Sequence, residues 1–162
     1  MRVMSTETRT VYIACRPEEL WAALTEGEQT RRWYLDAAIE SDFEVGGPVR
    51  FFAGGDGNFD DEDDQSRREA IRGEIRACEA ERVLAHSFAF VDLDEPASEL
   101  RWTIETIPGS PRVQRLTLVH DLGELPADSE TRRRAGFGWD MALSALKTWL
   151  ETRAPLELNF MG

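Results

Sequence analysis

Hydrophobic and polar positions alternate through most of the chain, which is the period of β-strands with one buried face. Within residues 8–15, for example, Val11, Ile13 and Cys15 alternate with their neighbours. The same reasoning predicts strands over residues 8–15, 69–78, 82–90, 100–107 and 113–120, with two more inside residues 37–52 around a Gly46-Gly47-Pro48 turn. The central part of the chain therefore predicts a run of antiparallel strands.

Helical signals follow the first strand directly. In residues 16–27, Pro17 suits the first helical position, the next two glutamates complement the helix dipole, and Leu20 with Leu24 forms an apolar stripe. Residues 28–35 predict a further turn or two of helix. Two short helices are thus expected between the first two strands.

The last element changes its period. Trp139, Leu143, Leu146 and Leu150 recur at spacings of four, three and four residues. This spacing predicts a long amphipathic helix over residues 131–153.

This order of elements indicates an α+β fold in which a curved antiparallel sheet wraps on the C-terminal helix. The 162 residues fit a single domain over 1–162, since a chain of this size buries a substantial core. A curved sheet closing on a helix leaves a concave space. Strand alternation and the helix start place large side chains there, and the predicted ligand-binding walls are Trp33, Phe51, Phe88, Phe90, Trp102, Phe137 and Met141.

Two histidines, His86 and His120, fall on the same apolar faces. They are predicted as polar contacts inside the cavity. The alternatives are a proton shuttle, part of a metal site, or plain packing against a backbone carbonyl. No third ligand or carboxylate is arranged beside them, so we predict neither catalytic residues nor a metal or cofactor.

Charge narrows the choice of partner. The net charge of −12 would repel phosphate backbones and anionic lipid headgroups, so nucleic acid and membrane insertion are not expected. Cys15 and Cys78 lack metal or redox spacing and are predicted as buried thiols in a reducing cytoplasm. The basic run Arg132 to Arg134 lies at the unfavourable end of the predicted helix dipole. We expect a solvated face there, and the alternative is pairing with the acidic loop or with another subunit.

The acidic loop, residues 54–66, begins an Asp-x-Asn-x-Asp pattern at Asp56 that resembles a calcium loop. An EF-hand loop requires Gly at its sixth position and Glu at its twelfth, and this chain has Asp61 and Arg67 there. We therefore predict a solvated hairpin tip that gates the pocket mouth or disfavours anionic ligands.

Several segments, in order, resemble a known family. They are "VYIACRPEELWAALTEGEQTRRWYL", "VGGPVRF", "IRGEIRACEAERVLAHSF", "RLTLVHDL" and "GWDMALSALKTWLE". Together they are similar to the START-like (SRPBCC) helix-grip superfamily, and within it to homologues of the C-terminal domain of the activator of the Hsp90 ATPase. The resemblance implies a helix-grip (START/Bet v 1-like) fold with a hydrophobic pocket between sheet and helix.

The family's functions range over lipid and hormone binding, polyketide cyclisation, stress-related roles and chaperone regulation, so fold alone does not select one. The expected function is binding of a small hydrophobic or aromatic molecule. One alternative is a cyclase-type or hydrolase-type enzyme in which a histidine acts as general acid or base. Another is a regulatory module that binds a protein partner such as a chaperone, or a second copy of this chain.

Overall fold

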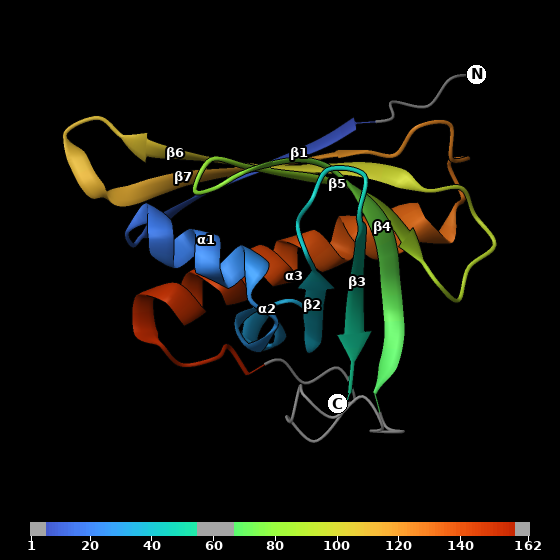
Figure 1. Cartoon of the computed structure of the whole chain (residues 1–162), viewed down its shortest axis with the longest axis horizontal. Coiled ribbons are helices and arrows are strands. Elements are labelled where there is room, and N and C mark those ends of the chain that lie inside the picture. Colours follow the sequence, from blue (N-terminus) through green and yellow to red (C-terminus); the bar gives the residue numbers. More distant parts are fainter. Residues whose placement is uncertain (1–5, 55–66, 158–162) are drawn as a thin grey trace.

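One antiparallel sheet of seven strands curves around the C-terminal helix in the computed structural model, which describes residues 6–54 and 67–157 (Figure 1). The elements in chain order are β1 (Thr6–Ala14), α1 (Pro17–Thr25), α2 (Gly27–Trp33), β2 (Ala37–Ser41), β3 (Pro48–Ala53), β4 (Arg68–Glu79), β5 (Val83–Phe90), β6 (Ser98–Ile107), β7 (Ser110–Asp121) and α3 (Glu130–Thr152). The spatial order is β1-β7-β6-β5-β4-β3-β2, so the two earliest strands form the two edges.

The predicted α+β fold class and its elements are confirmed. Each predicted strand and helix forms within a few residues of its expected bounds, including α3, which was predicted over residues 131–153. The loop predicted over residues 54–66 lies outside the described residues except for its first residue, Gly54. Its proposed gating role and its rejected calcium pattern therefore stay predictions.

Side chains from α3 close the β1 edge of the sheet. The Lys147 ammonium donates to the backbone carbonyl of Tyr12 at 2.6 Å, and the Glu151 carboxylate accepts from the backbone N–H of Ala14 at 2.8 Å. Lys147 and Glu151 also pair with each other at 2.8 Å. These two backbone groups near the end of β1 are therefore not offered to another chain, and α3 is held along this part of β1.

Thr30 on α2 closes the opposite edge. Its hydroxyl accepts from the backbone N–H of Ile39 at 3.0 Å and lies 2.9 Å from the Ala37 carbonyl, to which it donates. Thr30 is fully buried, so these groups of β2 have no water to bond. The contact fixes α2 against β2, and with it the chain that follows Trp33.

The core lies between the sheet and α3. Trp139, Leu143, Leu146 and Leu150 are all buried, as the spacing predicts. Two aromatic rings, Tyr34 directly after α2 and Trp102 on β6, meet Trp139 of α3 edge to face with ring centroids 5.7 Å apart. Such arrangements are the favoured geometry for aromatic pairs.

Neither cysteine takes part in a disulfide. Cys15 is buried, as predicted, and burial raises the pKa of its thiol to about 12, whereas Cys78 is only partly buried. Within the described residues, no helix is both long and apolar enough to cross a membrane.

Candidate functional site

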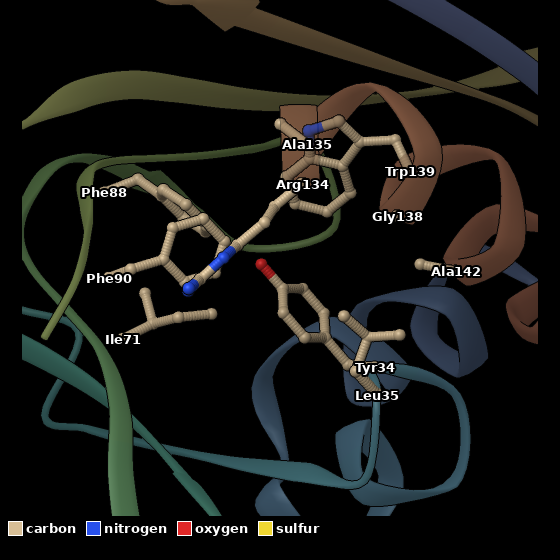
Figure 2. Close-up of a pocket in the computed structure, with 10 residues that line it drawn as sticks. All are labelled: Tyr34, Leu35, Ile71, Phe88, Phe90, Arg134, Ala135, Gly138, Trp139 and Ala142. Carbon is tan, nitrogen blue, oxygen red and sulfur yellow. The ribbon is translucent and has the colours of Figure 1, made fainter. Parts of the chain in front are cut away.

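A small pocket opens where the first half of α3 crosses β4 and β5. Five of its lining residues come from α3, namely Arg134, Ala135, Gly138, Trp139 and Ala142. The remaining walls are Tyr34 and Leu35 after α2, Ile71 on β4, and Phe88 and Phe90 on β5 (Figure 2). The site therefore joins three regions that are distant in sequence.

Small residues on α3 make this space. Ala135, Gly138 and Ala142 present little or no side chain to the sheet, whereas farther along the helix the leucines fill it. A β-carbon placed on Gly138 would have one neighbour within 4 Å, the Leu35 Cδ1 atom at 3.9 Å. Glycine in a helix interior costs roughly 1 kcal/mol relative to alanine. At Gly138 this cost leaves open space beside the pocket.

The pocket surface is almost entirely apolar, and the polar side-chain groups among its lining residues belong to Tyr34, Arg134 and Trp139. Tyr34 is 3% exposed, and its hydroxyl has no hydrogen-bond partner among residues 6–54 and 67–157. Burial raises the pKa of this phenol above its ordinary value of 10, so the hydroxyl keeps its proton at physiological pH. It is a neutral donor facing an apolar space.

The pocket has a volume of about 30 Å³, enough for a water-sized molecule. A cavity that holds benzene measures about 150 Å³, so a ring-sized ligand requires wall side chains to move. Leu35 is suited to this because 42% of it is exposed at the rim. Leu35 and Asp36 also adopt left-handed φ values of 50° and 58°, a conformation that costs non-glycine residues about 1–3 kcal/mol each.

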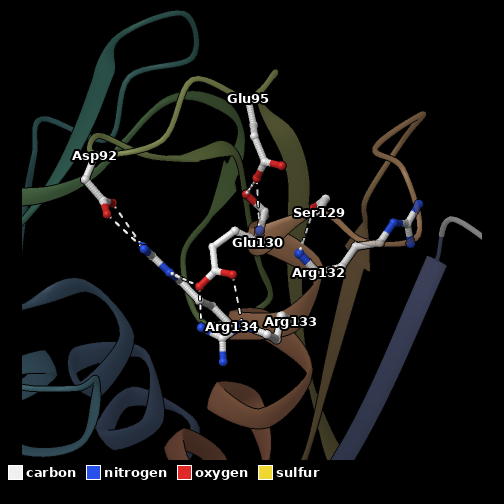
Figure 3. Close-up of polar contacts among 8 residues, drawn as sticks. Asp92, Glu95, Ser129, Glu130, Arg132, Arg133 and Arg134 are labelled. Carbon is white, nitrogen blue, oxygen red and sulfur yellow. Dashed lines mark hydrogen bonds and ion pairs between the residues drawn. The ribbon is translucent and has the colours of Figure 1, made fainter.

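Arg134 forms the polar rim of the pocket. Its guanidinium pairs with both oxygens of Asp92 at 2.9 and 2.8 Å and with Glu130 at 3.2 Å (Figure 3). The same group lies 4.9 Å from the ring centroid of Phe90, a cation–π distance. The basic run therefore finds its acidic partners in Asp92, on the β5–β6 connection, and in Glu130, within α3 itself.

The start of α3 is fixed by two further contacts. The Ser129 hydroxyl accepts from the backbone N–H of Arg132 at 3.0 Å, which is a conventional helix N-cap. Glu95 accepts from the Thr131 backbone N–H at 2.9 Å and from its hydroxyl at 2.6 Å (Figure 3). These bonds hold the pocket residues of α3 at a set distance from the β5–β6 connection.

Behind the pocket, a buried chain of hydrogen bonds links α3 to three strands. The Trp139 indole N–H donates to His120 Nδ1 at 3.0 Å, and His120 Nε2 lies 2.7 Å from Ser98 Oγ, which donates to the Phe88 carbonyl at 3.2 Å. An indole nitrogen only donates, so His120 carries its proton on Nε2. Both ring nitrogens of His120 are thereby used, and its role in the structure is to orient Trp139 and Phe88.

Acidification is expected to destabilise the protein through His120. Burial lowers the pKa of His120 from 6.5 to about 4 and lowers that of His86 as well. Below pH 6.5 the histidine is protonated in the unfolded chain but stays neutral in the folded chain. Its contribution to the free energy of unfolding is therefore fully present above pH 6.5 and is lost as the pH decreases towards 4. For His120 alone the expected loss between pH 7 and pH 5 is roughly 2 kcal/mol, measurable by urea unfolding at both pH values.

The matched variant is His120→Gln, which cannot take up a proton in this range. It should show a shallower loss of stability between pH 7 and pH 5 than the unmodified protein. An identical slope in both proteins would contradict the assignment of this pH dependence to His120.

His86 is buried elsewhere in the core. Its Nδ1 lies 2.7 Å from the Ser87 carbonyl and so donates to it, which leaves Nε2 as an acceptor without a hydrogen-bond partner in the described part of the chain. In those same residues, no group of three or more His, Cys, Asp or Glu side chains is placed to hold a metal ion. A histidine-based metal site therefore has no support from the geometry.

Of the residues predicted to line a cavity, Phe88 and Phe90 line this pocket. The others lie elsewhere: Trp33, Phe51, Trp102, His86 and His120 are buried in the core, and Met141 is partly buried on α3. A direct ligand contact by these residues stays a prediction. For Phe137 the prediction is wrong, because its side chain is 70% exposed on the outer side of α3.

The helical period explains this error. Successive helix residues are rotated by about 100°, so Phe137, two positions before Trp139, points roughly 200° away from the buried stripe. Sequence reasoning missed all five pocket residues on α3, which are Arg134, Ala135, Gly138, Trp139 and Ala142. Ala135 and Ala142 lie four positions before and three positions after Trp139, so they follow its period. Tyr34 and Leu35 directly follow the predicted wall residue Trp33, but nothing in their local pattern shows that they reach α3.

Comparison with known families gives one match along most of the chain. A family model described as activator of Hsp90 ATPase homolog 1-like protein matches residues 14–151, which include every residue that lines the pocket. No curated protein matches the chain in sequence.

Solved structures of similar shape confirm the helix-grip fold. DynU16, a protein from the dynemicin biosynthetic locus, is 20% identical with a TM-score of 0.68, covering 93% of this chain and 49% of its own, so this chain spans about half of DynU16. The Aha1 dimer from Colwellia psychrerythraea is 16% identical with a TM-score of 0.65, covering 92% and 98%. An HSP90 activator from Plasmodium falciparum is 19% identical with a TM-score of 0.67, covering 91% and 96%. At these identities the likeness concerns the fold.

Proposed function

Because this chain belongs to the family of activator of Hsp90 ATPase homologue 1-like proteins, a family model of which matches residues 14–151, we propose that it binds a small hydrophobic or aromatic molecule between its sheet and α3. The ligand lies against Phe88, Phe90 and Trp139. Entry of a ring-sized molecule displaces the Leu35 side chain at the rim.

The observation that carries this proposal is the apolar pocket beside the small residues of α3. Its walls combine aromatic rings with the Tyr34 hydroxyl, which has no hydrogen-bond partner in the described part of the chain. Apolar walls with a few polar groups are the usual composition of a small-molecule site. Leu35 in its left-handed conformation supports the proposal, since strained residues concentrate at ligand sites.

Binding is preferred to catalysis because neither histidine is arranged for proton transfer to a pocket ligand. His120 uses both ring nitrogens within the core, and His86 is absent from the pocket lining. Burial lowers the pKa of both, which weakens them as bases near pH 7. An enzyme of the cyclase or hydrolase type would need another acid or base.

The test fills the pocket from α3. We expect Gly138→Leu to weaken binding of the neutral fluorescent probe N-phenyl-1-naphthylamine by about tenfold or more, because steric changes of a few methylenes in an apolar pocket have effects of this size. Gly136→Leu is the matched control. A β-carbon on Gly136 meets its first neighbour, Glu7 Oε1, at 3.9 Å, and Gly136 does not line the pocket. Both variants gain helix propensity equally, so a difference between them reports on the pocket.

Equal probe binding by both variants would contradict the proposal. So would the absence of probe binding to the unmodified protein, together with native mass spectrometry that finds no mass released by organic extraction. The second candidate, binding of a protein partner or of a second copy of this chain, would then be favoured. The observation that supports this second candidate is the exposed side chain of Phe137 on α3.

A further inference from the structure

We propose that the pocket selects neutral ligands that carry a hydrogen-bond acceptor, a carbonyl oxygen above all, and that the Tyr34 hydroxyl donates to this group. The inference rests on the proposed ligand-binding function and adds the chemical class of the ligand. Tyr34 would then determine specificity, while the apolar walls supply most of the affinity.

The Tyr34 hydroxyl is buried beside the pocket. It projects into the space bounded by Phe90, Arg134 and Trp139 (Figure 2), and no atom of the described residues hydrogen-bonds to it. A buried polar group left unsatisfied costs about 1–3 kcal/mol. Phenylalanine would avoid this cost at the same place, so the hydroxyl is better explained by a ligand that satisfies it.

The ring of Tyr34 cannot turn to find another partner. Its backbone N–H donates to the Thr30 carbonyl at 2.6 Å, its ring stacks on Phe51 at 4.7 Å, and the rings of Trp33 and Trp139 meet it edge to face at 5.0 and 5.7 Å. The position of the hydroxyl oxygen is therefore fixed before any ligand binds, and only the O–H bond turns to meet an acceptor. A preorganised donor of this kind discriminates between ligands that offer an acceptor and those that do not.

The charges around the pocket favour a neutral ligand. Arg134, the cation at the rim, is already paired with Asp92 and Glu130, so it offers no free positive charge to a carboxylate. The net charge of −12 also repels anions. A neutral carbonyl compound avoids both penalties and still accepts the phenolic proton.

Water is a poor occupant of the same place. A buried water normally makes about three hydrogen bonds, and the pocket offers almost no polar surface besides Tyr34. A ligand carbonyl needs only one donor, because its remaining atoms contact the apolar walls. The pocket thus matches an apolar molecule with one acceptor better than it matches water.

The experiment compares acetophenone with ethylbenzene, two probes of similar shape of which only the first has a carbonyl. NMR titration measures the affinity of each for the unmodified protein, Tyr34→Phe and the control Tyr12→Phe, whose parent side chain is 50% exposed outside the pocket. We expect Tyr34→Phe to weaken acetophenone binding by about tenfold and to change ethylbenzene binding by less than about twofold. Tyr12→Phe should change neither.

Folding is checked separately, since Tyr34→Phe should leave the free energy of unfolding unchanged or slightly higher once the unsatisfied hydroxyl is gone. If Tyr34→Phe weakens both probes equally, or neither, the inference is overturned while the proposed function stands. If neither probe binds the unmodified protein and the Gly138→Leu and Gly136→Leu variants do not differ, the proposed function itself fails.

Discussion

Replacing Gly73 with alanine is expected to lower the free energy of unfolding by about 3 kcal/mol or more, because the added methyl group has no room. A β-carbon at this position would lie 1.8 Å from the Ser87 carbonyl oxygen and 2.7 Å from its carbon. Both atoms belong to the backbone of β5, so no side-chain rotation relieves the clash. The ladder between β4 and β5 would have to separate.

The damage should extend towards the pocket. The Ser87 carbonyl accepts from His86 Nδ1, and the Ser87 hydroxyl accepts from the backbone N–H of Glu74 at 2.8 Å. Phe88, the next residue of β5, lines the pocket. Moving Ser87 therefore disturbs a buried histidine and a wall residue together.

Urea unfolding measures the effect of Gly73→Ala, with Gly136→Ala as the control. Alanine in place of Gly136 on α3 should raise stability by up to about 1 kcal/mol, because it gains helix propensity and its β-carbon meets no atom closer than 3.9 Å. If Gly73→Ala stays within about 0.5 kcal/mol of the unmodified protein, the close approach of β4 and β5 is incorrect.

The elements of this fold were predictable because their signals are local. The alternation in residues 69–78 placed Ile71, Gly73 and Ile75 on one face, and the structure buries both isoleucines. The spacing of Trp139 and Leu143 fixed the buried side of α3 in the same way. Each signal depends on residues within a turn or a few strand positions of one another. The resemblance to a known family then supplied the arrangement of these elements, which local patterns cannot give.

The pocket was less predictable because it depends on where side chains are small. Alternation states which face of a strand is buried, but it does not say which buried residues border an empty space. Large aromatic side chains were predicted as walls, and three of the six, Trp33, Phe51 and Trp102, lie in the core away from this pocket. The space lies opposite Ala135, Gly138 and Ala142, and its position depends on how α3 crosses β5. That crossing is a property of the assembled fold.

The role of Tyr34 could not be predicted from the sequence either. Its sequence neighbours gave no reason to separate it from Trp33 as a core aromatic. Only the assembled structure shows that its hydroxyl is buried with no hydrogen-bond partner among the described residues, while its ring is fixed by three others. Whether a buried polar group has a hydrogen-bond partner depends on segments that are distant in the sequence. It therefore cannot be seen in a single sequence.

Removing the Trp139 side chain is expected to have an effect as large as that of Gly73→Ala, for a different reason. Truncating a buried tryptophan to alanine costs about 3–5 kcal/mol through lost burial and the cavity that remains. Trp139→Ala also removes the indole donor of His120 Nδ1, which leaves a buried acceptor unsatisfied. Phe137→Ala is the matched control on the same helix. It removes an exposed aromatic ring and should change stability by less than about 0.5 kcal/mol.

Trp139→Phe separates the hydrogen bond from the packing. It keeps an aromatic ring against Phe88 and Trp102 but removes the N–H that faces His120 Nδ1. Burial, the main cause of the low pKa of His120, remains in this variant, so NMR of the imidazole should still show a pKa well below 6.5. A pKa unchanged in Trp139→Phe would show that burial alone sets it. If Trp139→Ala loses no more stability than Phe137→Ala, then Trp139 does not hold α3 against the sheet. Other contacts would then have to keep the walls of the pocket in place.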